Sequence, residues 1–188
     1  MLKMNTYLFT GLLSMALLAV SCSDNALTDH QFESDALTVL QKSESTATQS
    51  HHNDMSALLQ DVKKATARYN STTQAVKGGY MEDTHCVAHP DMGGMGYHWL
   101  NEELVDPVFD PLTPEVLVYE KDKNGNSKLV AVEYIVIDVG QPHPHFGDYT
   151  LDVGGTPVPD PHYSLHVWLY KDNPNGTFTP FNPNVSCD

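Results

Sequence analysis

The sequence is poor in basic residues. It has 10 Lys and Arg against 24 Asp and Glu, which gives a formal net charge of -14 at pH 7 with histidine neutral. A surface with this charge repels the phosphates of nucleic acid and anionic lipid headgroups, so we expect neither as a partner. The same charge attracts cations and suits an exported domain.

Several motifs of known chemistry are absent. The chain has no phosphate-binding loop, no Gly-x-Ser-x-Gly elbow, no His-Glu-x-x-His zinc helix and no calcium-binding EF-hand loop. Residues 122–126 (DKNGN) lack the calcium spacing and are typical of a turn. The motifs therefore give no reason to expect an enzyme, although they do not exclude one.

The apolar run at the N-terminus is too short to span a bilayer comfortably, which takes about 20 residues. It covers residues 7–20, is interrupted at Thr10, Gly11 and Ser14, and follows one basic residue, Lys3. A cationic start followed by a short apolar stretch is typical of a secretory signal peptide.

This segment ends in a cysteine. Residues 18–22 (LAVSC) resemble the lipobox of bacterial lipoproteins, and the serine before Cys22 is similar to the Bacteroidetes form. The resemblance implies that residues 1–21 are a lipoprotein signal peptide and that a lipid on Cys22 anchors the mature chain to a membrane. We expect the cell envelope, with the outer membrane as the site of anchoring. The alternative is a plain secretory signal with a cysteine there by chance.

Cysteine is scarce, with three residues in the chain. Lipidation would use Cys22, which leaves Cys86 and Cys187. In an oxidising compartment we expect this pair to form a disulfide that holds the C-terminus to the domain and contributes a few kcal/mol of stability. A pair of thiolate metal ligands is the alternative, which no Cys-x-x-Cys spacing supports.

Composition divides the mature chain into a tether and one domain. Residues 22–53 are rich in Ser, Thr, Asp, Gln and His, so we expect a flexible tether. Residues 54–188 have the length of a single domain. Apolar residues recur at three-and-four spacing over residues 55–76, which predicts one amphipathic helix of about six turns. Asn53 is its expected N-cap, and the glycine pair at 78–79 its expected end.

Three later segments have the character of β-strands. They are residues 116–120 (VLVYE), 129–137 (LVAVEYIVI) and 163–170 (YSLHVWLY). Asn-Gly at 124–125 predicts a hairpin turn, and the proline- and glycine-rich stretches 107–114 and 140–161 predict loops. The predicted fold class is α+β: one long N-terminal amphipathic helix packed on a small antiparallel β-sheet with long Pro/Gly-rich loops.

One carboxylate interrupts a strand that is apolar on both faces. Glu133 would be costly to bury unless it is paired, hydrogen-bonded or bound to a metal. If the sheet brings Glu133 beside His166, and His98 joins them, two imidazoles and a carboxylate would form a site for a divalent metal. The alternatives are a solvated or structurally hydrogen-bonded Glu133, or a catalytic acid or base.

Other histidines suggest further sites. Alternation on the third strand puts five residues on one face, which is either a lined pocket or the solvated side: His162, Ser164, His166, Trp168 and Tyr170. His143-Pro144-His145 resembles the His-x-His of cupin metal sites, but the glutamate of the cupin motif is missing. A fourth set would suit copper, with a glycine-rich turn as the alternative: His85, His89, Met92 and Met95.

Four segments resemble an uncharacterised family of small exported bacterial proteins: residues 94–101 (GMGYHWLN), 106–120 (DPVFDPLTPEVLVYE), 129–136 (LVAVEYIV) and 165–187 (LHVWLYKDNPNGTFTPFNPNVSC). The resemblance implies a single domain and no particular activity. We therefore expect a lipid-anchored envelope protein that binds a divalent metal or a small ligand through a pocket of His98, Glu133 and His166. A non-catalytic structural or interaction protein of the envelope is the alternative.

Overall fold

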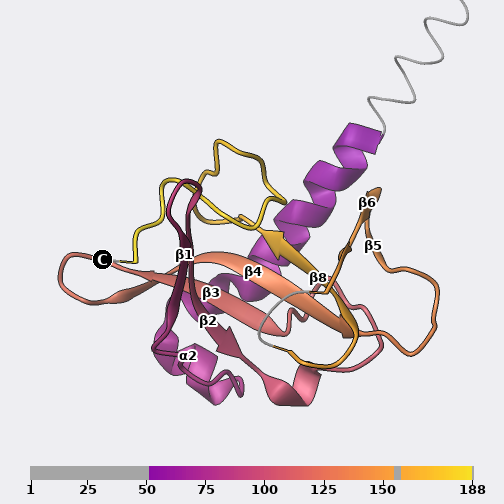
Figure 1. Cartoon of the computed structure of the whole chain (residues 1–188), viewed down its shortest axis with the longest axis horizontal. Coiled ribbons are helices and arrows are strands. Elements are labelled where there is room, and N and C mark those ends of the chain that lie inside the picture. The colour runs from indigo at the N-terminus through magenta and orange to yellow at the C-terminus, as the bar shows by residue number, and fades with distance from the viewer. Residues whose placement is uncertain (1–50, 155–157, 188) are drawn as a thin grey trace, which may run out of the picture. The chain divides into compact units, whose positions relative to one another are not determined.

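The computed structural model describes residues 51–154 and 158–187, which fall within one compact unit, Ser43–Asp188 (Figure 1). The predicted signal peptide, Cys22 and nearly all of the predicted tether lie outside the described residues. The described part combines helices with a six-stranded antiparallel β-sheet, so the predicted α+β class is confirmed. Within these residues, no helix is long and apolar enough to cross a membrane.

The strands are β1 (Cys86–His89), β2 (Gly93–Leu100), β3 (Val116–Lys121), β4 (Ser127–Ile137), β5 (His145–Phe146), β6 (Tyr149–Thr150), β7 (Asp152–Val153) and β8 (His162–Val167). The main sheet has the order β1-β2-β3-β4-β8-β7, and β5 and β6 form a separate pair. Each of the three predicted strands is present as β3, β4 or β8. The Asn-Gly turn joins β3 to β4, with Gly125 at a φ of +80°.

The central strand β4 separates two hydrophobic cores. The helix-side core includes Val62, Tyr69, Leu117, Tyr119, Leu129, Val132, Tyr134, Val136, Leu165 and Val167. The second core, which we call the site-side core, contains Val116, Val118, Val130, Ala131, Ile135, Trp168 and Val185. Strict alternation along β4 would put Val130 in the helix-side core. A shift of register opposite Val118 and Tyr119 instead sends both Val130 and Ala131 to the site side.

The prediction of a single long helix is wrong. An α-helix covers residues 51–66, a 3-10 turn (η1, Ala67–Asn70) follows, and α2 (Thr72–Lys77) begins after Ser71, whose backbone is extended. The tighter turn and the extended residue change the phase of the pattern, so Val76 is 60% exposed and Ala75 is buried in its place. Asn53 lies inside the helix and is not its N-cap, whereas the expected stop at Gly78 is the C-cap of α2.

The helix over residues 51–66 packs on the helix-side core and crosses behind the strands in Figure 1. Val62 is fully buried there, and Met55, Leu58 and Leu59 contact the same core. The hydroxyl of Tyr119 donates to the backbone carbonyl of Tyr69 over 2.6 Å. The apolar stripe of the helix therefore stays on one side of the sheet and leaves the other side to the site.

The hairpin of β1 and β2 was not predicted, because its glycines disfavour strands. They are needed for close contact with other backbone segments. Gly94 donates to the carbonyls of Asn182 and Val185, and a Cβ on Gly94 would lie 2.9 Å from Val185. The C-terminal segment thus lies along β2, where Val185 enters the site-side core.

Strand β8 ends at Val167, earlier than expected. Trp168 packs in the site-side core, and its indole N–H donates to the backbone carbonyl of Thr179. Tyr170 was predicted on the same face, but it packs against the helix-side core and donates from its hydroxyl to the carbonyl of Lys63. The chain leaves the ladder after Val167, so alternation no longer determines the direction of Tyr170.

Candidate metal centre

The sheet brings His98, Glu133 and His166 together from β2, β4 and β8. Glu133 and His166 are direct partners across the β4–β8 ladder, so their side chains share a face. His98 lies opposite Val118, one strand further from β4. In a flat sheet β2 and β8 would be about 14 Å apart, because three strand spacings of about 4.8 Å separate them. The contact between the two imidazoles therefore requires a sheet that curls around this face.

The three side chains are in direct contact. Nε2 of His98 lies 3.1 Å from Nε2 of His166 and 3.5 Å from Oε2 of Glu133. Oε1 of Glu133 lies 3.3 Å from Nδ1 of His166. Each residue offers one ligand atom, and these three atoms lie within 4.8 Å of one another. Among the described His, Cys, Asp and Glu side chains, no other group of three meets this criterion. The two distances at His98 are close to the separation of about 3.4 Å between ligands of a tetrahedral zinc ion.

The three side chains of the cluster are largely buried. The side chains of His98, Glu133 and His166 are 10%, 6% and 4% exposed. Burial raises the pKa of Glu133 to about 8, with a further contribution from the charge of Glu115. Burial lowers the pKa of His98 to about 4 and that of His166 to about 3. Without a metal, all three groups are therefore mostly neutral at pH 7, and their contacts are not ion pairs.

The carboxyl is incompletely satisfied. Oε2 of Glu133 is buried and has no hydrogen-bond partner among the residues that the structure describes. The three residues thus have the donor atoms and the burial that a metal site needs.

Two pockets reach the cluster from different sides. One, of about 210 Å³, includes His98 in its wall, together with Glu82 and Asp83. The other, of about 200 Å³, includes Glu133 and His166. The residues that complete these walls had no signal in the sequence, because only the curled sheet and the returning C-terminal segment bring them to the cluster.

The other histidines make separate contacts. Nε2 of His143 lies 2.6 Å from the backbone oxygen of Leu151, and His145 contacts the hydroxyl of Thr150; neither joins a group of three metal-ligating side chains among the described residues. Two histidines of the proposed copper set are also engaged elsewhere. His85 binds Asp83, and His89 packs against Phe181. His162 is buried and bonds the carbonyl of Asp160.

A second buried carboxyl, Glu115, was missed in the sequence. It is 2% exposed and accepts a hydrogen bond from the backbone N–H of Ile135 over 3.0 Å. Burial raises its pKa to about 8. In the sequence, Glu115 stands directly before a strand of apolar residues. This position alone does not show that its carboxyl points into the core.

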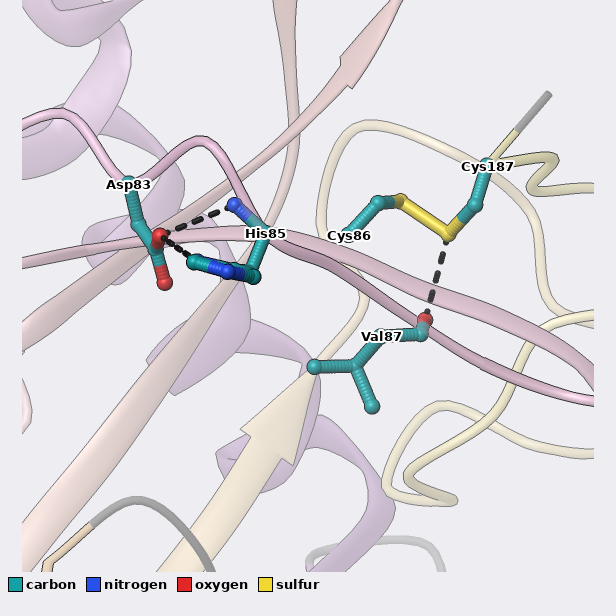
Figure 2. Close-up of a disulfide and its surroundings, with 5 residues drawn as sticks. All are labelled: Asp83, His85, Cys86, Val87 and Cys187. Carbon is teal, nitrogen blue, oxygen red and sulfur yellow. Dashed lines mark hydrogen bonds and ion pairs between the residues drawn. A yellow bond between two sulfur atoms is a disulfide. The ribbon is translucent and has the colours of Figure 1, made fainter.

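Cys86 and Cys187 lie at disulfide distance, with 2.05 Å between their sulfur atoms, as predicted from the cysteine count (Figure 2). The structure thus favours the disulfide over the alternative of two thiolate metal ligands. The disulfide joins β1 to the end of the C-terminal segment, and the Cys187 sulfur contacts the carbonyl oxygen of Val87. The neighbouring His85 turns toward Asp83.

Comparison of the chain with protein-family models, curated proteins and solved structures finds no match. The resemblance to a family of small exported bacterial proteins therefore stays a prediction. The geometry of the cluster carries the functional argument that follows.

Proposed function

We propose that this chain is an exported lipoprotein of the cell envelope, anchored by a lipid on Cys22, whose α+β domain binds one divalent transition-metal ion through His98, Glu133 and His166. The segment between Cys22 and the first helix would serve as the tether. Two separate lines of support exist, one for the metal and one for the location.

The observation that carries the metal proposal is the unpartnered Oε2 of Glu133. A buried polar atom without a partner costs about 1–3 kcal/mol, and such atoms are rare in folded proteins. Nε2 of His98 lies 3.5 Å from this oxygen, which is longer than an ordinary hydrogen bond. An ion bound between these atoms would satisfy the carboxylate and both rings, and it would replace the proton that Glu133 otherwise holds.

The donor set indicates the class of metal. Two imidazole nitrogens and one carboxylate oxygen suit zinc, copper, nickel, cobalt, iron and manganese, whereas calcium and magnesium prefer oxygen donors alone. Metal ligation also requires neutral histidines, and burial already lowers the pKa of both rings. The net charge of -14 adds a long-range attraction for cations.

The location proposal is supported by the N-terminal sequence and by the disulfide. Residues 7–20 are apolar and lead directly to Ser21 and Cys22. Disulfides are rare in reducing compartments and common in proteins exported to oxidising ones, which agrees with the pairing of Cys86 and Cys187.

The test is the metal content of the polypeptide from Ser23 onward, purified without a His-tag or chelator and measured by mass spectrometry. We expect near-stoichiometric metal, and its loss in His166→Ala and Glu133→Gln. His145→Ala is the matched control, since it removes an exposed histidine whose ring contacts Thr150 and lies outside the cluster. Equal metal in all variants would contradict the proposal. It would equally fail if no variant held metal and added zinc, copper or manganese did not raise the melting temperature.

A structural role is the second candidate, and one observation favours it. The two imidazoles lie within hydrogen-bond distance of each other, with 3.1 Å between their Nε2 atoms. In that case the cluster is a buried hydrogen-bonded network of an interaction protein, and Glu133→Gln would change stability alone.

A further inference from the structure

We infer that the metal ion held by His98, Glu133 and His166 keeps one coordination position open toward the 200 Å³ pocket, where a small uncharged oxygen or nitrogen donor binds the ion directly. This inference rests on the proposed metal site and adds a ligand to it. The pocket, which we call the ligand pocket, has Met95, Asp152, Ser164 and Pro180 in its wall beside Glu133 and His166.

The number of protein ligands is the first step of the argument. Among the described His, Cys, Asp and Glu side chains, no fourth residue joins the group of three. Structural zinc sites are closed by four protein ligands, whereas sites with three ligands, two histidines and a glutamate included, keep a position for water or substrate. The hydroxyl of Ser164 donates to the carbonyl of Gly154, so the remaining sources of a fourth ligand at this pocket are Met95 and a molecule from outside the protein. A thioether suits copper(I) better than zinc or cobalt(II).

The ligand pocket is the better of the two approaches to the ion. Its wall contains two of the three proposed ligands, whereas the pocket beside Glu82 and Asp83 contains only His98. Its volume is below the 300–1,000 Å³ typical of sites for drug-sized molecules, so the occupant is small.

Charge selects the class of ligand. Asp152 pairs with Ser164 across the β7–β8 ladder, which puts its exposed side chain on the face that carries His166. A carboxylate at this position and a net charge of -14 oppose the entry of anions. Met95 and Pro180 add apolar wall. An uncharged donor such as an alcohol, a carbonyl group or a neutral imidazole fits this wall best.

Cobalt(II) provides the test, because its visible absorption reports exchange of a ligand. The polypeptide from Ser23 onward contains every residue that the structure describes. It would be loaded with cobalt and titrated with azide and, separately, with imidazole at pH 8 in 0.15 M salt. We expect both to change the spectrum saturably as they displace water.

Charge reversal at the pocket then locates the open position. Asp152→Lys changes the charge in the wall of the ligand pocket by two units, which should strengthen azide binding severalfold even after screening by salt. Binding of neutral imidazole should change less than twofold. Glu82→Lys makes the same charge change in the wall of the other pocket and should strengthen azide binding less, because the bound azide lies in the ligand pocket.

The remaining outcomes of the cobalt experiment would each contradict one part of the inference. No cobalt binding would refute the proposed metal site itself. Cobalt binding without any response to azide or imidazole would refute the open position. A response that appears only in Met95→Leu would show that Met95 fills the position, and a larger effect of Glu82→Lys than of Asp152→Lys would place the opening on the other side.

Discussion

Glu133 and His166 are direct partners in the β4–β8 ladder, with Oε1 of the carboxyl 3.3 Å from Nδ1 of the ring. Their contact depends on register, because a slip of one residue along β4 would turn Glu133 to the helix side of the sheet. The large apolar residues of the helix-side core, such as Val132 and Tyr134, oppose that slip. The packing of the core therefore also assembles the candidate site.

Replacing Glu133 with Gln should separate metal binding from stability. Burial raises the pKa of Glu133 to about 8, so the metal-free protein holds a mostly protonated carboxyl at pH 6. An amide of the same shape should change the free energy of unfolding there by less than about 1 kcal/mol. The same variant should lose metal, because it lacks the anionic oxygen. Urea unfolding and metal titration check the two parts. Comparable metal affinity in both proteins would contradict the assignment of Glu133 as a ligand.

Glu115 should make the metal-free protein less stable as the pH rises. Burial raises its pKa from 4.5 to about 8, so the folded state holds a proton that the unfolded state has lost. Its contribution to stability is complete below pH 4.5 and disappears as the pH passes 8. The loss approaches about 1.4 kcal/mol per pH unit where only the folded state is protonated.

The measurement is urea unfolding between pH 7 and 8, where His98 and His166 are mostly neutral in both the folded and unfolded states. Because the pKa of Glu133 is raised in the same direction, the comparison uses Glu133→Gln with and without Glu115→Gln. The added substitution should flatten the pH dependence of the free energy of unfolding, because an amide does not titrate. Its oxygen can still accept the hydrogen bond from the backbone N–H of Ile135. Parallel curves for the two proteins would contradict the role of Glu115.

Gly96, two residues before His98, should not tolerate a side chain. Its φ is +111°, and a Cβ would lie 2.6 Å from the backbone oxygen of Tyr119. Gly96→Ala should therefore cost about 3 kcal/mol and weaken metal binding at least tenfold, because it separates β2 from β3 and moves His98. Gly125→Ala is the control, with a φ of +80° and nothing within 4 Å of the added carbon, and should cost only about 1–2 kcal/mol. Equal losses in stability and metal affinity would show that the contact with Tyr119 is unimportant.

Periodicity in the sequence predicted most of what lies in the centre of the sheet. The strands β3, β4 and β8 have continuous or alternating apolar residues, and Glu133 was noticed because it breaks such a run. The burial of Glu133 and its pairing with His166 follow from the ladder, which the sequence did not specify. Their contact with His98 depends on the curl of the sheet across three strand spacings, and no local pattern records that curvature.

The edge of the sheet was not predictable for a different reason. The hairpin of β1 and β2 contains glycines that allow close contact with the C-terminal segment of the domain. The backbone hydrogen bonds between Gly94 and Asn182 are an example. Read locally, the same glycines indicate a turn. The break of the predicted helix at Ser71 is likewise hidden, because the apolar spacing of Tyr69 and Val76 continues as though the helix were straight.

Cys22 should determine whether the protein is membrane-bound. In a bacterial host that processes lipoproteins, we expect the full chain in the membrane fraction and shortened by its signal peptide. Cys22→Ser should abolish lipid attachment and leave the unprocessed or soluble form, since the serine cannot form the thioether. Incorporation of a labelled fatty acid is the measurement, and Cys187→Ser, which keeps Cys22, is the control. Labelling of the Cys22→Ser variant would contradict the proposed anchor.

The disulfide should stabilise the domain without contributing to the metal site. Cys86 and Cys187 are 101 residues apart in the chain, and closing a loop of this length contributes about 2–5 kcal/mol. The double variant Cys86→Ser/Cys187→Ser, in the polypeptide from Ser23, should lose that amount in urea unfolding. It should still bind metal, because Gly94 holds the C-terminal segment through its own backbone hydrogen bonds.

Wild-type protein unfolded in the presence of a reductant should match the variant, and without reductant its unfolded state should show no free thiol. Two titratable thiols in that state would contradict the pairing, and loss of metal in the variant would mean that the disulfide holds β2 and His98 in place.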